Sequence, residues 1–113
     1  MSFTDGMIDV AAVLDDIKRL AAIESPTADP AGVNRVLDAI AARFAATGAA
    51  CRREKVDPRF GEMLRVTCDP AQTGPGILVL SHVDTGPPVG TLAQYLPLRQ
   101  EGDRLYGPGV FDM

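Results

Sequence analysis

The first part of the chain contains apolar residues at the spacing of one helical face. They lie three and four residues apart at Val10, Val13, Leu14, Ile17, Leu20 and Ala21, as an amphipathic helix requires. This pattern predicts a helix over residues 7–23. We expect it to end at Ser25 and Pro26, because proline restricts the residue before it and has no backbone N–H to donate.

A second stripe predicts another helix shortly afterwards. Asp29 suits the N-cap and Pro30 the first helical position, and a glycine that can adopt the left-handed conformation, Gly48, follows the stripe. The apolar members of this stripe are Val33, Val36, Leu37, Ile40, Ala41, Phe44 and Ala45.

After Gly48 the pattern changes to short segments that are typical of strands. Residues 49–56 and 63–68 flank a turn-rich stretch, which predicts a hairpin. If its centre lies between Arg59 and Phe60, Cys51 faces Cys68 across the two strands. The unbroken aliphatic run 77–80 predicts a strand covered on both faces. The expected fold class is therefore α/β, with helices packed on a sheet.

The region beyond residue 85 differs again. Residues 86–109 include 5 glycines and 4 prolines, which predicts a long loop followed by a small hairpin that turns at residues 101–103. Loops of this length usually serve a function.

Composition and charge narrow the function classes. The chain has 113 residues and a net charge of −4, which suits one small domain or part of a larger one and argues against binding to nucleic acid. No apolar run reaches the roughly 18 residues of a membrane span, and the N-terminus lacks the basic start of a secretory signal. We therefore expect a cytoplasmic protein without a membrane partner. Cys51 and Cys68 are expected to be buried, reduced thiols.

The candidate chemistry centres on the single histidine. His82 and Asp84 are two residues apart, so in an extended strand their side chains share a face, and a carboxylate can orient an imidazole that binds a metal. Asp112 is a second isolated acid, which follows the tight Gly107–Gly109 loop. The alternative is that His82 and Asp84 form a hydrogen-bonded core pair without any metal. Zinc titration distinguishes these two interpretations.

These segments resemble a known family. The stretches Ile77-Leu-Val-Leu-Ser-His-Val-Asp-Thr85, Pro88-Val-Gly-Thr-Leu92 and Glu101-Gly-Asp-Arg-Leu-Tyr-Gly-Pro-Gly-Val-Phe-Asp-Met113 resemble the zinc-dependent glutamate carboxypeptidase, acetylornithine deacetylase and aminoacylase family. The resemblance implies that residues 1–113 form the N-terminal portion of a three-layer zinc-peptidase catalytic domain, with two helices packed on a partial mixed sheet.

The resemblance also implies roles for the three candidate residues. His82 and Asp112 match metal ligands, with Asp112 bridging two zinc ions, and Asp84 matches a catalytic-site acid that orients the histidine. Cobalt or manganese can replace zinc at such carboxylate-rich sites. Family members have a cis peptide after the bridging carboxylate, but we expect a trans bond or disorder at Asp112–Met113.

The implied activity is a metallocarboxypeptidase of the glutamate carboxypeptidase type, which cleaves a C-terminal amide or an N-acyl amino acid bond. Its substrates would be small peptides or N-acyl amino acids, and the full-length protein would dimerise through a domain missing here. The general base and further metal ligands are expected in segments outside the chain, so the fragment alone should be inactive. Two alternatives remain: an N-acyl amino acid deacetylase of the same family, and a non-catalytic metal-binding or interaction module.

Overall fold

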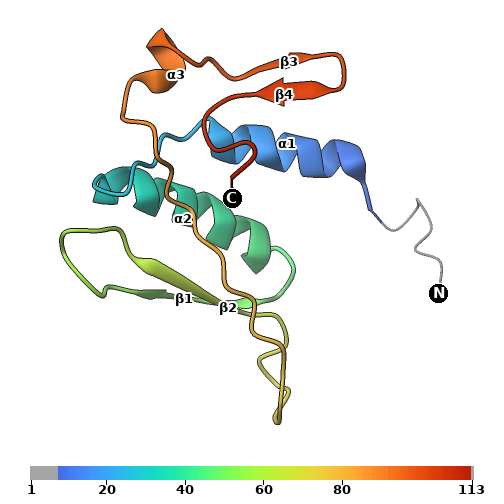
Figure 1. Cartoon of the computed structure of the whole chain (residues 1–113). Helices are drawn as coiled ribbons and strands as arrows, with labels where there is room; N and C mark the ends of the chain where they lie inside the picture. Colours follow the sequence, from blue (N-terminus) through green and yellow to red (C-terminus); the bar gives the residue numbers. More distant parts are fainter. Residues whose placement is uncertain (1–7, 113) are drawn as a thin grey trace.

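Two helices form the middle of the molecule in this computed structural model, which describes residues 8–112. Helix α1 spans Val10–Ala21 and helix α2 spans Pro30–Ala45 (Figure 1). Asp9 caps α1 by accepting a hydrogen bond from the Ala12 N–H at 3.0 Å. Both predicted helices are confirmed within the described residues.

The ends of α2 follow the predicted signals in part. Asp29 occupies the N-cap position and Pro30 begins the helix, although the Asp29 side chain makes no capping hydrogen bond. Beyond the last turn, Gly48 has a φ of +84°, the left-handed conformation expected of a residue that ends a helix.

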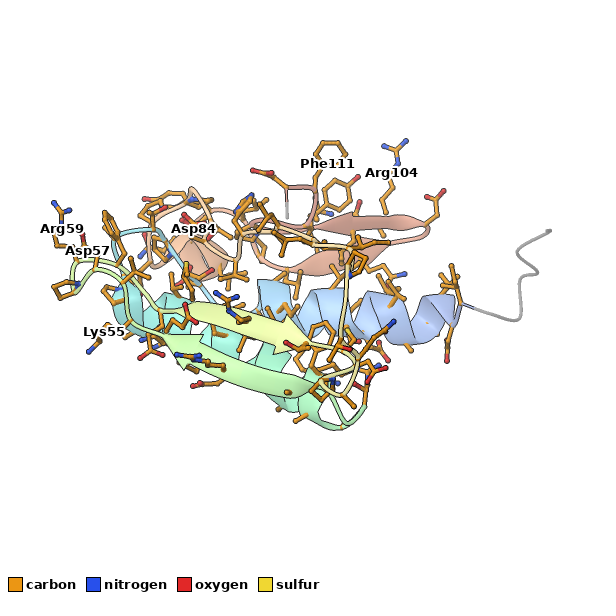
Figure 2. All side chains as sticks on the ribbon, turned by 90° about the horizontal axis from the view of Figure 1, so that it is seen from below. Lys55, Asp57, Arg59, Asp84, Arg104 and Phe111 are labelled. Carbon is orange, nitrogen blue, oxygen red and sulfur yellow. The ribbon has the colours of Figure 1, made fainter. Side chains whose placement is uncertain are left out.

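A hairpin covers α2 on the side away from α1, as both views show (Figures 1 and 2). Strand β1 spans Ala50–Glu54 and pairs antiparallel with β2, Met63–Thr67. The hairpin predicted from the sequence is confirmed, but its register is not the expected one. Cys51 lies opposite Val66 rather than opposite Cys68.

The turn explains the shift in register. The Phe60 N–H donates to the Asp57 carbonyl at 3.1 Å, so Pro58 and Arg59 are the central residues of the turn. Proline favours the first central position of such a turn, and aspartate the position before it. The centre therefore lies one residue earlier than expected, between Pro58 and Arg59.

The expectation of buried cysteines is also wrong. Cys51 and Cys68 are both free and exposed. Cys51 is the second residue of β1 and Cys68 follows the last residue of β2, so both lie at the open end of the hairpin. There the Cys51 Sγ lies 3.8 Å from the Ala41 carbonyl oxygen.

A second, smaller hairpin lies beside α1, on the side away from α2 (Figures 1 and 2). Strands β3 (Arg99–Glu101) and β4 (Arg104–Tyr106) pair antiparallel after the short helix α3 (Thr91–Gln94). Gly102 begins the two-residue turn with a φ of +60°, which a type II′ turn requires at that position. The predicted turn over residues 101–103 is confirmed.

The run 77–80 does not form the expected covered strand. No strand is assigned there, and its four side chains are exposed, from 80% at Val79 to 95% at Ile77. A strand needs neighbours for its backbone hydrogen bonds, and in residues 8–112 β2 pairs with β1 alone. The aliphatic pattern therefore marks a segment that is suited to burial but has no covering layer in the described structure.

The core is small and centred on α2. Val33, Val36 and Leu37 are its buried apolar side chains among the described residues, and an ion pair of 3.0 Å between Arg43 and Asp16 joins α2 to α1. Helices and small antiparallel sheets make the described chain a mixed α/β structure. The expected mixed sheet is not present in residues 8–112, where both sheets are antiparallel. No described helix has the length and apolar character needed to cross a membrane.

Candidate functional site

His82 lies between the two carboxylates singled out from the sequence. Its Nδ1 is 3.2 Å from Asp84 Oδ1 and 3.1 Å from the Asp84 main-chain oxygen. On the opposite edge of the ring, Nε2 is 3.7 Å from Asp112 Oδ1. The structure therefore brings together all three candidate residues, although His82 does not follow the buried strand that was expected to carry it.

The contacts of His82 favour the tautomer with the proton on Nδ1. Both atoms that face Nδ1 are oxygens that can only accept when Asp84 is ionised, so Nδ1 carries the proton. In the neutral ring with this tautomer, Nε2 carries the lone pair, and Asp112 Oδ1 is 3.7 Å from it. A carboxylate oxygen and a lone pair that face each other favour a cation between them, either a proton or a metal ion.

A segment between the two helices holds His82 and Asp84 in place. The Ser25 side chain is only 1% exposed and its hydroxyl donates to the Val83 carbonyl at 2.9 Å. The Thr85 N–H donates to the Ser25 carbonyl at 2.8 Å, and Pro26 forms an isolated parallel bridge with Thr85. Residues 83–85 are therefore kept extended by the segment that follows α1.

Asp84 is ionised more readily than an ordinary aspartate. The hydrogen bond from the Thr27 hydroxyl, 2.5 Å long, is the largest of the effects that hold the pKa of Asp84 below its usual 3.8. Partial burial opposes this effect, while the Asp84 main chain and His82 add to it. Asp84 is labelled in Figure 2. The ionised carboxylate keeps its role as acceptor toward His82.

The C-terminal loop brings Asp112 to the site. Gly109 has a φ of +72°, and a Cβ at this position would lie 2.8 Å from Thr85 Cγ2. Only glycine can combine this backbone conformation with such a close approach. Asp112 itself is 87% exposed, and the preceding Phe111 is fully exposed and points away from the helices (Figure 2).

His82 also borders a cavity. This cavity has a volume of about 440 Å³ and lies between the two long helices and the C-terminal loop. Its lining is largely apolar and includes Ile17, Leu20, Val36, Ile40, His82 and Val110. The surroundings of the imidazole are thus polar where it faces the two carboxylates and apolar where it faces the helices.

Glu24 anchors the start of α3. Its carboxylate accepts hydrogen bonds from the Gly90 N–H, at 2.9 Å to Oε2, and from the Leu92 N–H, at 2.9 Å to Oε1. These bonds, with the one from Gly90 the largest cause, hold the pKa of Glu24 below its usual 4.5. This contact holds the loop that follows Asp84 against the segment that follows α1.

Sequence reasoning missed Glu24, Ser25 and Thr27. The signal that could have found them is the pair of hydroxyl residues on either side of Pro26, since such residues outside a helix commonly bond to nearby polar groups. Their partners lie more than fifty positions away in sequence, which no local pattern reveals.

The site is incomplete as a metal centre in the described part of the chain. Within residues 8–112, no group of three or more histidine, cysteine, aspartate or glutamate side chains is arranged to hold a metal ion. The donors that His82 and Asp112 offer, an imidazole nitrogen and a carboxylate oxygen, are nonetheless types that zinc accepts.

Comparison with known proteins gives one informative similarity. No family model matches the chain. Carboxypeptidase G2 of Pseudomonas sp. (strain RS-16) is 32% identical over 101 residues, which make up 89% of this chain and 24% of that protein. The chain thus spans about a quarter of the length of the curated relative it matches. This similarity supports a carboxypeptidase-like family and, more weakly, a hydrolase.

Proposed function

We propose that residues 1–113 are the N-terminal portion of a three-layer catalytic domain in a zinc-dependent metallocarboxypeptidase that releases C-terminal glutamate. The observation that carries this proposal is that His82 Nε2 lies 3.7 Å from Asp112 Oδ1, while Nδ1 of the same ring faces Asp84. Two acceptors in this arrangement provide a place for a cation. The similarity to a carboxypeptidase supports the reaction class.

Each of the three residues has a distinct part in the proposed site. His82 and Asp112 would ligate the metal, and Asp84 would keep the imidazole in the tautomer that leaves Nε2 free. Zinc–nitrogen and zinc–oxygen bonds of usual length, at a tetrahedral angle, separate two ligand atoms by about 3.4 Å. The 3.7 Å between His82 Nε2 and Asp112 Oδ1 is close to that value.

Zinc, when bound, supplies a Lewis acid that polarises a carbonyl group and lowers the pKa of a water molecule. The chain's own residues bind and orient: Asp84 holds the Nδ1 proton, and Thr27 holds Asp84. Cobalt or manganese would fit the same donors. The substrate class that suits this chemistry is a small peptide, or an N-acyl amino acid with the same kind of amide bond.

Zinc titration by calorimetry tests the ligand assignment. We expect weak binding by the wild-type chain, because it offers two protein ligands where tight zinc sites have three or four. His82→Ala and Asp112→Asn should abolish measurable binding. Asp103→Asn, which removes an exposed carboxylate in the β3–β4 turn, is the matched control and should bind as the wild type does. Unchanged zinc binding by His82→Ala would contradict the proposal.

A hydrolysis assay tests how much of the active site the chain contains. With zinc and an N-acyl glutamate we expect no turnover by the 113-residue chain, because the two carboxylates that contact His82 are both engaged in orientation or ligation. Zinc-dependent turnover that His82→Ala abolishes would show that the chain holds a complete site. Turnover of N-acetyl amino acids without glutamate preference would favour the deacetylase alternative.

A further inference from the structure

We infer that Thr27 is a positioning residue for His82 and that it acts through Asp84, an inference that rests on the proposed metal-binding role of His82. The Thr27 hydroxyl donates to Asp84 Oδ2 at 2.5 Å. The other carboxylate oxygen, Oδ1, faces His82 Nδ1 at 3.2 Å. Because both oxygens are held, the plane of the Asp84 carboxylate is fixed with one edge toward the imidazole.

Thr27 is itself held by the backbone on either side of it. The Asp29 N–H donates to the Pro26 carbonyl at 2.8 Å and closes a turn around Thr27. Before the turn, Ser25 is buried and its hydroxyl donates a hydrogen bond to the Val83 carbonyl. The same short segment that keeps residues 83–85 extended therefore also aims the Thr27 hydroxyl at Asp84, while leaving Thr27 itself exposed to solvent.

Loss of the hydroxyl would remove one of the two contacts that fix the carboxylate. Oδ2 of Asp84 would then lose its short hydrogen bond, and the side chain could rotate away from the ring. His82 Nδ1 would keep the Asp84 main-chain oxygen, 3.1 Å away, as an acceptor. The imidazole would keep the main-chain oxygen as a hydrogen-bond acceptor but lose the ionised carboxylate. The tautomer with the proton on Nε2 would therefore become more populated. That tautomer cannot bind a metal through Nε2.

Thr27→Val and Thr27→Ser form a matched pair for the test. Valine keeps the shape of the side chain and removes the hydroxyl, whereas serine keeps the hydroxyl and removes the methyl group. Thr47→Val is the control, because the Thr47 hydroxyl donates to the Phe44 carbonyl at the far end of α2. The readouts are the imidazole ¹⁵N signals of the metal-free chain at pH 8 and the zinc dissociation constant by calorimetry. With only one histidine in the chain, both ring ¹⁵N signals belong to His82, and their couplings to the ring Hδ2 and Hε1 protons distinguish Nδ1 from Nε2.

We expect the wild type, Thr27→Ser and Thr47→Val to show the tautomer protonated at Nδ1. Thr27→Val should show a mixture of tautomers and bind zinc about tenfold more weakly, the lower end of the loss usual for residues that orient a ligand. Thr27→Ser should bind zinc as the wild type does. A purely structural role would not separate the valine from the serine variant in the tautomer signal.

The outcomes separate this inference from the proposed function. Zinc binding by the wild type, with an unchanged tautomer and affinity in Thr27→Val, would overturn the role of Thr27 and leave the proposed function standing. A tautomer change in Thr27→Val without zinc binding by the wild type would support the role of Thr27 and overturn the metal site. If Thr27→Val does not fold, the ¹⁵N signals of the wild type and of Thr27→Ser test the inference. A tautomer with the proton on Nε2 in either protein would overturn it.

Discussion

Gly109 and Thr85 approach so closely that no side chain can be placed between them: a Cβ on Gly109 would lie 2.8 Å from Thr85 Cγ2. The contact joins the C-terminal loop, which carries Asp112, to the segment that carries His82 and Asp84. We predict that Gly109→Ala destabilises the chain by about 1–2 kcal/mol, because the left-handed conformation, φ +72°, is unfavourable for alanine.

The same variant should weaken zinc binding, since Asp112 would move away from His82. Gly76→Ala is the control, because a Cβ there would meet no atom within 4 Å and its φ is not positive. Urea unfolding and zinc titration measure both effects. Equal stability of the two alanine variants would contradict the role given to the Gly109 conformation.

Glu24 should make stability depend on pH in the acid range. Its pKa is lower in the folded chain than the usual 4.5, so its contribution is present above that value and is lost as the pH falls through the lowered pKa. We predict that Glu24→Gln shows a flatter decrease in unfolding free energy below pH 4.5 than the wild type does. Asp15→Asn is the control, because Asp15 is an exposed α1 residue. If the unfolding free energy of Glu24→Gln fell with pH as steeply as that of the wild type, the Gly90 and Leu92 amides would not favour the ionised form of Glu24.

Two leucines in contrasting surroundings should respond differently to truncation. Leu37 is 4% exposed in α2, and Leu78 is 81% exposed in the aliphatic run 77–80. Leu37→Ala should cost about 2–5 kcal/mol of unfolding free energy, the usual range for a buried leucine. Leu78→Ala should change it by less than about 0.5 kcal/mol. Chemical denaturation compares them, and a large loss in Leu78→Ala would mean that the run is covered in solution.

The cysteines should react as surface thiols. Because both are free and exposed, we expect Cys51 and Cys68 to react with a thiol reagent in the native chain as completely as in denaturant. Cys51→Ser and Cys68→Ser should each remove one equivalent of fast-reacting thiol. Slow native labelling that denaturant accelerates would indicate burial instead.

Local sequence patterns correctly predicted the helices and hairpins that form through interactions between neighbouring residues. The spacing of Val10, Val13 and Leu14, the Pro30 start of α2 and the Gly102 turn each depend on neighbours within a few residues, so both helices and both hairpins could be predicted. The predicted hairpin register was wrong because its centre was placed by the lengths of the two flanking segments. The turn closed by the hydrogen bond from Phe60 to Asp57 instead follows the positional preferences of Asp57 and Pro58.

The wrong prediction for residues 77–80 and the supporting residues missed at the site have a different origin. An aliphatic run indicates that a strand is suited to burial, but burial depends on whether other strands cover it. At the site, His82, Asp84 and Asp112 could be selected because each is an isolated polar residue next to apolar ones. Thr27 could not, because its partner Asp84 lies 57 positions away along the chain.

The bonds between the segment after α1 and residues 83–92 have a consequence for the order of folding. They join residues 57 to 68 positions apart, whereas the helices and hairpins close over short distances. Closing such long loops is slow compared with forming local structure. On the ribosome, α1, α2 and the β1–β2 hairpin can form before Leu92 emerges. Amide hydrogen exchange at Thr85 should therefore report opening of the late-formed region separately from the unfolding of α2.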